Sequence, residues 1–301
     1  MKWSEDSLSN ELYAQYERKL VWIFGTPRSG STWLAREILA RERIAVVREP
    51  LIGAFIGVFQ EDIMLYYLVT QGREVIEFQR IIDASMDDDR RFFCATFEPV
   101  WLKSIGRMIL DRFMAQFNIK EYDYVIVKAP NESHAADIIM KCFPTSRLIF
   151  LMRDGRDVID SRQGKFYNPE TKIRPNTPEE MRYRITYYAN LWNMHMTITN
   201  RAYELHNPTL RCLVKYEDLR LDPFAQVKKI YEFLGIALSD KEIIEVIERT
   251  KFENVSEDER GEDKIKRKAS PGSWKEIFSA DEIQLMNRIM SPILLKFGYK
   301  F

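Results

Sequence analysis

The 301-residue chain lacks the features that mark secreted, membrane-spanning or nucleic-acid-binding proteins. Its three cysteines, Cys94, Cys142 and Cys212, lie far apart and fit neither a disulfide framework nor the spacing of metal ligands. No apolar stretch reaches the length of a membrane-spanning helix, and the first residues do not resemble a signal peptide. The 45 basic and 45 acidic residues cancel, so no broad basic field favours nucleic acid as a partner. We therefore expect a cytoplasmic protein with no membrane span, no metal site and no nucleic-acid partner.

Short apolar runs alternate along the chain with helical patterns. The apolar runs predict strands at residues 20–24, 44–48, 123–128, 147–152 and 210–215. The last four are rich in Ile, Val, Leu and Phe with little alternation, as is typical of parallel strands covered on both faces. Helical patterns fall near 30–42, 101–118, 133–142, 155–164, 179–206, 223–234, 240–250 and 280–297. The sequence predicts an α/β fold with a mostly parallel central sheet flanked by helices. We expect the chain to form a single domain over 1–301 with a helical insertion at about 51–118.

Three residues mark expected helix boundaries. Asp222, which precedes a proline, and Ser279 are suitable N-terminal caps. Pro292 is expected to kink or end the last helix, because proline lacks the backbone N–H that a helix interior requires.

The loop after the first strand resembles a P-loop but lacks its lysine. Residues 25–33 read G-T-P-R-S-G-S-T-W between an apolar run and a helical pattern. A glycine-bounded loop of this kind directs backbone N–H groups and a helix N-terminus at an anion. In the pattern G-x-x-x-x-G-K-[ST], Ser31 stands at the lysine position, and the cation is Arg28 within the loop. Because that lysine serves the β- and γ-phosphates of a nucleoside triphosphate, its loss disfavours ordinary ATP or GTP hydrolysis.

A second basic motif follows the fourth predicted strand. Residues 153–161 read R-D-G-R-D-V-I-D-S, so Arg153 stands at the carboxyl end of the strand, where open α/β sheets bind ligands. Ser161 lies about two helical turns further on. An arginine and a hydroxyl so placed can bind one phosphate together. The alternative is a surface cluster in which the charged residues from Arg153 to Asp157 pair among themselves.

The two motifs together resemble the sulfotransferase family, whose donor is 3′-phosphoadenosine 5′-phosphosulfate (PAPS). The family's 5′-phosphosulfate loop reads T-x-P-[KR]-S-G-[ST]-T-W, which residues 26–33 nearly reproduce. The resemblance implies a P-loop NTPase-like fold, with Arg28 at the sulfuryl group and Trp33 near the adenine. It further implies that Arg153 and Ser161 bind the 3′-phosphate. The 5′-phosphate would be held by Ser29, Gly30, Ser31 and Thr32.

Two further segments are similar to parts of the same family. Residues 267–274 read R-K-A-S-P-G-S-W and resemble the family's R-K-G-x-x-G-x-W, with Ala269 where the family often has glycine. The resemblance implies that Arg267 and Lys268 close over the 3′-phosphate, whereas a solvated basic loop is the plain alternative. The run Y-E-D-L that begins at Tyr216 resembles a family segment whose tyrosine lies near the adenine. An ordinary strand end is the alternative there.

The catalytic base has two candidates. Glu49 follows the second predicted strand, and its Glu-Pro pair resembles the carbohydrate sulfotransferases, for which a glutamate is the proposed base. Cytosolic phenol and steroid enzymes instead carry K-x-H at a strand end. Here Lys128 is followed by Ala and Pro130, and the nearest histidine is His134, expected in the first turn of the next helix. The resemblance is therefore closer to the carbohydrate, tyrosylprotein or bacterial enzymes, and Lys128 can face the transferred group.

The expected reaction moves a sulfuryl group from PAPS to a hydroxyl and releases adenosine 3′,5′-bisphosphate (PAP). The acceptor is a small molecule, a carbohydrate, a lipid or a peptide, and the oligomeric state is left open. The apolar, aromatic segment 55–68 is either a buried core helix or a hydrophobic wall for the acceptor. The alternatives are a P-loop small-molecule kinase with an atypical loop and a catalytically inactive nucleotide-binding module.

Overall fold

The structure is a computed structural model that describes residues 10–53, 68, 69, 77, 80, 87–90, 93–165, 177–250 and 271–301. Arg267 and Lys268 lie outside the described residues, as does the apolar segment up to residue 67. The functions expected of them therefore stay predictions.

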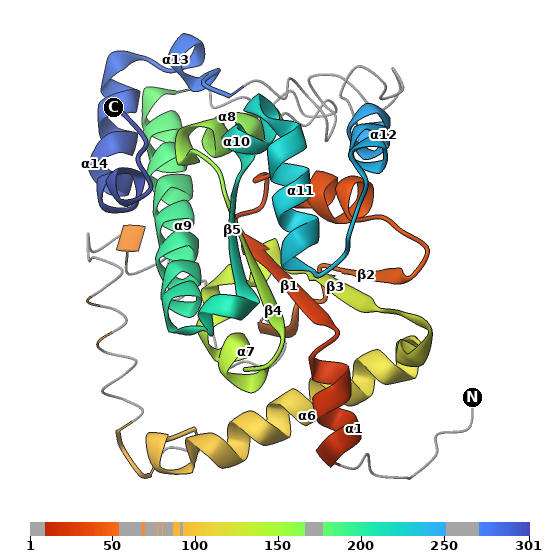
Figure 1. Ribbon diagram of the computed structural model, residues 1–301. Coiled ribbons are helices and arrows are strands. Elements are labelled where there is room, and N and C mark those ends of the chain that lie inside the picture. The colour runs from red at the N-terminus through yellow and green to blue at the C-terminus, as the bar shows by residue number, and fades with distance from the viewer. Residues whose placement is uncertain are drawn as a thin grey trace. The chain divides into compact units, whose positions relative to one another are not determined.

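Five strands form one sheet, and helices flank it (Figure 1). Their order is β2-β3-β1-β4-β5, and β3 pairs in parallel with both β1 and β2. Lys128 at the end of β3 is the register partner of Ile23 on one side and of Arg48 on the other. These findings confirm the predicted α/β fold with its mostly parallel sheet, and each strand begins and ends within one residue of the prediction. The strands are β1 (Leu20–Gly25), β2 (Ile44–Arg48), β3 (Tyr124–Lys128), β4 (Arg147–Met152) and β5 (Arg211–Lys215).

The chain divides into two compact units. Unit one comprises residues 1–24, 39–150 and 198–212, and unit two comprises residues 25–38, 151–197 and 213–301. Each unit consists of three separate segments of the chain. Strands β4 and β5 each begin in unit one and end in unit two. The single domain expected from the sequence stays a prediction.

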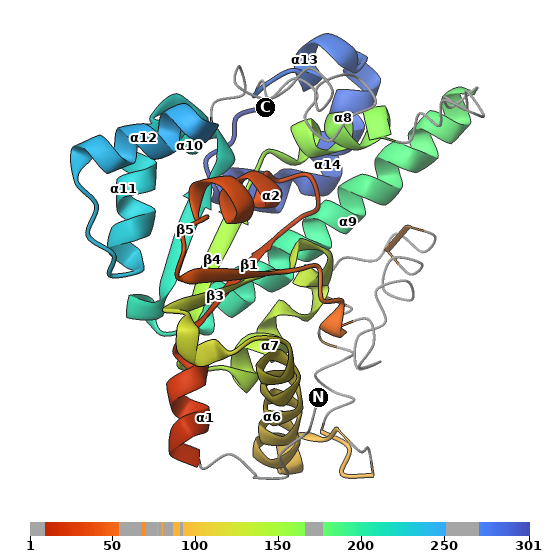
Figure 2. The same cartoon turned by 90° about the vertical axis from the view of Figure 1, so that its right-hand side faces the viewer.

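Unit one has an aromatic core around the strand β1. Trp22 is fully buried, and its ring lies 5.8 Å from that of Phe24 and 5.3 Å from that of Phe143. Such ring pairs add about 0.5–1.5 kcal/mol each beyond the apolar area they bury. Helix α1 packs beside α6 in both views (Figures 1 and 2). The helical elements of this unit are α1 (Asn10–Glu17), η2 (Ala95–Phe97), α6 (Glu98–Gln116), η3 (Ile119–Glu121), η4 (Pro130–Ala135), α7 (Ala136–Cys142) and η5 (Pro208–Leu210).

Unit two contains most of the remaining helices. The two expected caps are confirmed: the Asp222 side chain accepts a hydrogen bond from the backbone N–H of Ala225, and Ser279 forms a capping box with Glu282. Helix α9 begins in this unit and ends in unit one. The elements are α2 (Ser31–Trp33), η1 (Leu34–Ile38), α8 (Gly155–Lys165), α9 (Pro178–Leu205), α10 (Tyr216–Leu221), α11 (Pro223–Phe233), α12 (Asp240–Thr250), α13 (Trp274–Ile277) and α14 (Ala280–Lys296).

One helical segment differs from the sequence expectation. The helix expected over 30–42 is a single turn, α2, followed by the π-helix η1, which ends at Ile38. Side chains of other helices donate hydrogen bonds to its last carbonyls: the Tyr231 hydroxyl donates to the carbonyl of Ile38, and the Arg249 guanidinium donates to that of Glu37. These bonds satisfy terminal carbonyls that a longer helix would use internally.

Pro292 lies inside α14 and does not end it, since the helix continues to Lys296. Packing outweighs the lost hydrogen bond, because the buried face of α14 includes Met286, Met290 and Leu294. A Cβ added to Gly155 at the start of α8 would lie 2.5 Å from the sulfur of Met290, so the two helices meet closely.

Candidate functional site

The loop after β1 is shaped by two glycines. A Cβ at Gly25 would lie 2.4 Å from the carbonyl oxygen of Leu151, so only glycine fits there. Gly30 has a φ of 94°, and a Cβ on it would lie 2.7 Å from the Tyr216 ring. The backbone N–H of Ser29 donates to the carbonyl of Thr26 at 3.0 Å, which closes the turn. The loop therefore wraps tightly before α2, with the geometry of an anion cradle.

Arg28 lies at the centre of this loop with a strained backbone. Its φ is 78°, a left-handed value that non-glycine residues seldom adopt. Its Nε donates to the Ser161 hydroxyl at 3.0 Å, and its carbonyl accepts a bond from the Arg153 guanidinium at 2.8 Å. The structure thus brings Arg28 together with Arg153 and Ser161, which both lie more than 120 residues further along the sequence.

Three buried polar atoms lie on the loop and on Arg153. The hydroxyls of Thr26 and Ser29 and the Nε of Arg153 are buried, and none has a hydrogen-bond partner within the described part of the chain. A buried polar group without a partner costs about 1–3 kcal/mol. Hydroxyls and a guanidinium are the groups that bind phosphate and sulfate oxygens. The residues present therefore fit a phosphate-containing ligand.

Aromatic rings continue the site from Arg153. The Arg153 guanidinium carbon lies 4.4 Å from the centre of the Tyr216 ring, in cation–π geometry. The Tyr216 ring in turn meets the Trp33 ring edge-on, with centres 5.9 Å apart. Burial raises the pKa of Tyr216, and the nearby Arg153 charge opposes this shift. The predicted residues Trp33, Arg153 and Tyr216 therefore lie in one continuous row.

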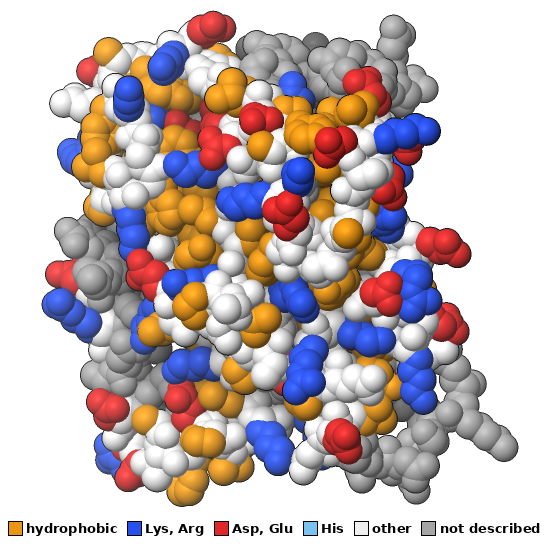
Figure 3. Space-filling view, viewed as in Figure 1, with side chains coloured by type: hydrophobic (Ala, Val, Ile, Leu, Met, Phe, Trp, Pro, Cys, Tyr) orange, Lys and Arg blue, Asp and Glu red, His pale blue; other side chains and the backbone are white. Residues whose placement is uncertain are grey.

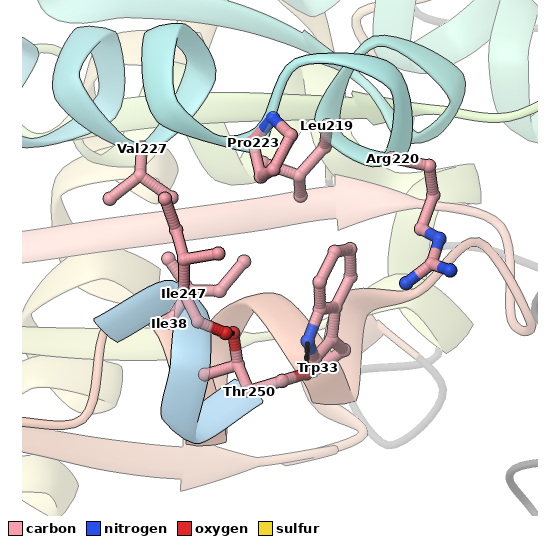
Figure 4. Close-up of a pocket in the computed structure, with 8 residues that line it drawn as sticks. All are labelled: Trp33, Ile38, Leu219, Arg220, Pro223, Val227, Ile247 and Thr250. Carbon is pink, nitrogen blue, oxygen red and sulfur yellow. Dashed lines mark hydrogen bonds between the residues drawn. The ribbon is translucent and has the colours of Figure 1, made fainter. Parts of the chain in front are cut away.

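A cavity of about 180 Å³ opens beside Trp33 (Figure 4). The indole Nε1 of Trp33 donates to the carbonyl of Thr250 at 3.0 Å. Across the same space, the Arg220 guanidinium carbon lies 5.8 Å from the Trp33 ring centre. Apart from these polar groups, the lining is aliphatic. The lining residues are Trp33, Ile38, Leu219, Arg220, Pro223, Val227, Ile247 and Thr250.

The sequence analysis did not identify Arg220 or Thr250. Arg220 lies four residues after Tyr216, and side chains at that spacing share one helix face. That spacing could have identified it. Thr250 stands 217 residues from Trp33 with no motif around it, so its contact depends on tertiary packing.

The acidic residues of the second basic motif make contacts different from those of Arg153. Asp154 accepts hydrogen bonds from Nε and Nη2 of Arg156, whose guanidinium carbon lies 3.9 Å from the Trp274 ring centre. Asp157 accepts the backbone N–H of Gly272 at 2.7 Å, and Asp160 accepts the Ser273 hydroxyl at 2.7 Å. The alternative of internal pairing therefore holds for Asp154 and Arg156. The segment of residues 272–274, which follows Arg267 and Lys268 in sequence, is anchored to α8.

In unit one, Glu49 lies next to Lys128. One carboxylate oxygen of Glu49 pairs with the Lys128 ammonium, and the other accepts a bond from the Asn131 amide. The Lys128 side chain is 7 % exposed, whereas that of Glu49 is 32 % exposed. Glu49 and Leu51 both have positive φ, 47° and 56°. With Arg28, they are the non-glycine residues with positive φ in the described chain, and strain of this kind gathers at functional sites.

Glu132 is a buried carboxylate near Glu49 that the sequence analysis missed. Its side chain accepts the backbone N–H of Gly53 at 3.0 Å. Burial raises the pKa of Glu132 to about 7, although backbone N–H groups of the 51–53 turn oppose the shift. The charge of Glu49 raises it further. A glutamate four residues after the strand-end Lys128 was the available sequence signal.

The rival base, His134, lies in the same region. It is in the 3-10 helix η4, which precedes α7, so the expectation of a place in the first turn of the next α-helix was wrong. Its side chain is 3 % exposed, and a Cβ at Gly53 would lie 3.3 Å from its Nε2. His195 and His206, in or just after α9, are also buried.

The described surface matches the balanced composition. Figure 3 shows basic and acidic side chains interspersed over the described part of the face that is seen in Figure 1. In the part of the chain that the structure describes, no helix is long and apolar enough to cross a membrane. Within those same residues, no three His, Cys, Asp or Glu side chains are grouped to hold a metal ion.

Comparison with known proteins identifies the family. Residues 21–240, well over half of the chain, match the sulfotransferase family. The chain therefore belongs to the sulfotransferase family, which confirms the resemblance seen in its motifs.

Individual relatives are distant. A flavonol sulfotransferase-like protein of Flaveria bidentis is 27 % identical over 169 residues, 49 % of this chain and 54 % of the relative. The omega-hydroxy-beta-dihydromenaquinone-9 sulfotransferase Stf3 of Mycobacterium tuberculosis is 26 % identical over 135 residues, 44 % of this chain and 34 % of the relative. The chain thus spans about half or less of the length of these curated relatives.

Solved structures share the fold at low identity. Mouse sulfotransferase SULT7A1 in complex with PAP has a TM-score of 0.55 and 14 % identity, over 95 % of this chain and 90 % of the other. Sulfotransferase STF9 of Mycobacterium avium has a TM-score of 0.53 and 14 % identity, over 94 % of this chain and 78 % of the other. Both confirm the predicted sulfotransferase fold.

Proposed function

We propose that this protein transfers a sulfuryl group from PAPS to an acceptor hydroxyl and releases PAP. One observation carries the proposal: Arg28, Arg153 and Ser161 meet at a glycine-bounded loop, where buried hydroxyls and a guanidinium nitrogen have no partner in the described chain. Membership of the sulfotransferase family and the PAP complex of a structural neighbour support the identity of the nucleotide.

The two parts of the nucleotide would occupy different parts of unit two. The loop backbone from Ser29 to Thr32 would hold the 5′-phosphosulfate, since N–H groups at a helix start favour anions. Arg153, with its charge beside the loop, would bind phosphate oxygens of the same nucleotide. The cavity beside Trp33 offers an aromatic wall and an aliphatic lining, which suit a flat purine ring.

Arg28 is the proposed electrostatic catalyst. Sulfuryl transfer moves negative charge onto the bridging oxygen of the leaving phosphate, and a guanidinium there stabilises that charge in the transition state. A positioned donor of this kind contributes on the order of 10²- to 10³-fold to turnover. The strained backbone and the bond to Ser161 hold the Arg28 side chain in place.

Glu49 is the proposed base for the acceptor proton. Its carboxylate is partly exposed, whereas His134 is almost fully buried. Lys128 and Asn131 orient the two carboxylate oxygens. Glu49 directly follows β2, and its partner Lys128 ends β3, the strand that pairs with β2.

A small molecule with a hydroxyl group is the proposed acceptor class. The relatives named above are described as acting on a flavonol and on an omega-hydroxy menaquinone derivative. Another structural neighbour is a retinol dehydratase in a complex with retinol and PAP, with a TM-score of 0.52. Carbohydrate and peptide hydroxyls are the alternatives for the acceptor panel.

Two measurements test the proposal. Calorimetry with PAP should show binding to the purified chain without added metal, and transfer of ³⁵S from labelled PAPS should be found with at least one acceptor class. Failure to bind PAP would refute the proposal. Magnesium-dependent binding of ATP in its place would support a small-molecule kinase, and PAP binding without turnover on any acceptor would support an inactive nucleotide-binding module.

A further inference from the structure

The C-terminal residues 297–300 form hydrogen bonds with two segments that carry proposed nucleotide-binding side chains, Arg153 and Tyr216. One of these segments begins at Arg153, after β4, and the other is the start of α10 at Tyr216. The Tyr299 hydroxyl donates to a Glu217 carboxylate oxygen at 2.9 Å, and the Arg156 guanidinium donates to the carbonyl of Lys300 at 2.8 Å.

Glu217 is the point at which the three segments meet. Its second carboxylate oxygen accepts the backbone N–H of Asp154 at 2.8 Å. Asp154 directly follows Arg153, and Glu217 directly follows Tyr216. One carboxylate therefore joins the backbones beside the two residues that stack at 4.4 Å. Burial raises the pKa of Glu217, and the bonds from Asp154 and Tyr299 oppose this shift.

A second set of contacts also holds the C-terminal residues. Asp154 accepts hydrogen bonds from Nε and Nη2 of Arg156, which is 1 % exposed and donates to the carbonyl of Lys300. The Lys215 ammonium donates to the carbonyl of Phe297 and lies 5.4 Å from the centre of the Tyr299 ring. Tyr299 is thus held at its ring by Lys215 and at its hydroxyl by Glu217.

We propose that Glu217, held by Tyr299, is a positioning residue that sets Arg153 and Tyr216 in the geometry that binds the nucleotide. This inference rests on the proposed function, because it assigns nucleotide binding to Arg153 and Tyr216. A guanidinium that is already ordered loses less conformational freedom when the ligand arrives. The C-terminal residues therefore contribute to affinity without touching the ligand.

The first test removes one oxygen atom. Tyr299→Phe should weaken PAP binding by about 3- to 10-fold in calorimetry, since part of a hydrogen bond to a charged group is lost. The KM for PAPS should rise by the same factor, while kcat at saturating PAPS should stay within about twofold. Tyr183→Phe is the matched control, because it makes the same chemical change at an exposed tyrosine. Unchanged PAP affinity in Tyr299→Phe would overturn the inference.

A conservative pair separates geometry from charge. In Glu217→Gln, the amide oxygen can accept the Asp154 N–H and the amide nitrogen can donate to the Tyr299 oxygen, so affinity should stay within about twofold of wild type. Glu217→Ala keeps neither bond and should bind PAP as weakly as Tyr299→Phe or more weakly. Equal weakening in both Glu217 variants would show that charge matters and not position, which would overturn the inference.

Amide hydrogen exchange makes the inference testable apart from the proposed function. In Tyr299→Phe without nucleotide, the Asp154 amide should exchange faster than in wild type, while amides of β3 in unit one stay unchanged. If wild type binds no PAP, the proposed function falls. Unchanged exchange at Asp154 would show that Tyr299 does not hold this segment, and would overturn the positioning whatever the protein binds.

Discussion

The charged residues of unit two and those of unit one are arranged differently. In unit two, Arg153 stacks on Tyr216 and donates to the carbonyl of Arg28, but its Nε has no acceptor in the described residues. In unit one, both carboxylate oxygens of Glu49 have partners, Lys128 and Asn131. A site that binds an anion keeps hydrogen-bond donors for it, whereas a base is most effective when its own carboxylate is already oriented. The comparison therefore supports a binding function for unit two and a proton-accepting function for Glu49.

The largest expected effect comes from Arg28. Arg28→Ala should lower kcat about 10²- to 10³-fold, because it removes the charge proposed to stabilise the leaving phosphate oxygen. Single-turnover transfer from ³⁵S-labelled PAPS measures this directly. Arg28→Lys keeps a cation that the family loop also uses, and is the matched control.

Arg153→Ala should affect binding more than turnover, the reverse of Arg28→Ala. It should mainly raise the Kd for PAP and lower kcat less than Arg28→Ala does, since charge-assisted hydrogen bonds to phosphate act in binding. If the two alanine variants lower kcat and affinity in equal proportion, the separate functions proposed for the two arginines are wrong.

The next effect concerns the base of unit one. Glu49→Gln should lower kcat about 10²-fold or more, the usual contribution of a general base, while PAP affinity stays near wild type. His134→Asn is the comparison variant, and its kcat should change little. If the histidine variant loses turnover and the glutamine variant keeps it, His134 is the base.

A pH effect on stability should come from Glu132. Burial raises its pKa from 4.5 to about 7, so between these values the folded chain binds the proton that the unfolded chain releases. The contribution of Glu132 is fully present below pH 4.5 and is lost as the pH rises through 7.

Glu132→Gln should remove this contribution. The difference in unfolding free energy between the wild type and the variant should change by at most about 1.4 kcal/mol per pH unit inside this window. Denaturant unfolding at several pH values measures it, with the exposed Glu276→Gln as control. A pH-independent difference would mean that Glu132 does not titrate there.

The smallest effect is expected at Arg220. Arg220→Ala should weaken PAP binding several-fold, since cation–π contacts with a ring contribute about 0.5–2 kcal/mol. Adenosine 5′-monophosphate should lose affinity by the same factor if Arg220 contacts the base. A loss for PAP alone would place Arg220 at the 3′-phosphate.

Local signals in the sequence predicted much of the fold. The five strands follow from apolar runs, and the helix starts at Asp222 and Ser279 follow from side chains that cap a helix. The anion loop followed from motif spacing, and Arg153 from the rule for carboxyl ends of parallel strands. The resemblance to the sulfotransferase family joined Arg153 and Ser161 to the loop in one nucleotide site.

The missed features depend on packing between distant segments. The Trp33–Thr250 contact and the Glu217–Tyr299 bond join residues 217 and 82 positions apart, where no periodicity applies. Side chains of α11 and α12 donate hydrogen bonds to the last carbonyls of the π-helix after Trp33, which lets this helix end early. Sequence patterns identify what a segment can form, but its partners follow only from the assembled fold.

Three residues, Arg28, Glu49 and Leu51, have a left-handed backbone that lowers the stability of the fold. Two of them, Arg28 and Glu49, carry the proposed chemistry. Each such backbone costs about 1–3 kcal/mol for a residue with a side chain, and glycine would relieve it. A library of variants selected only for folding should therefore accumulate glycine at these positions, while selection for turnover should retain Arg28 and Glu49. The positions at which the two selections diverge would locate the site without any assay of the acceptor.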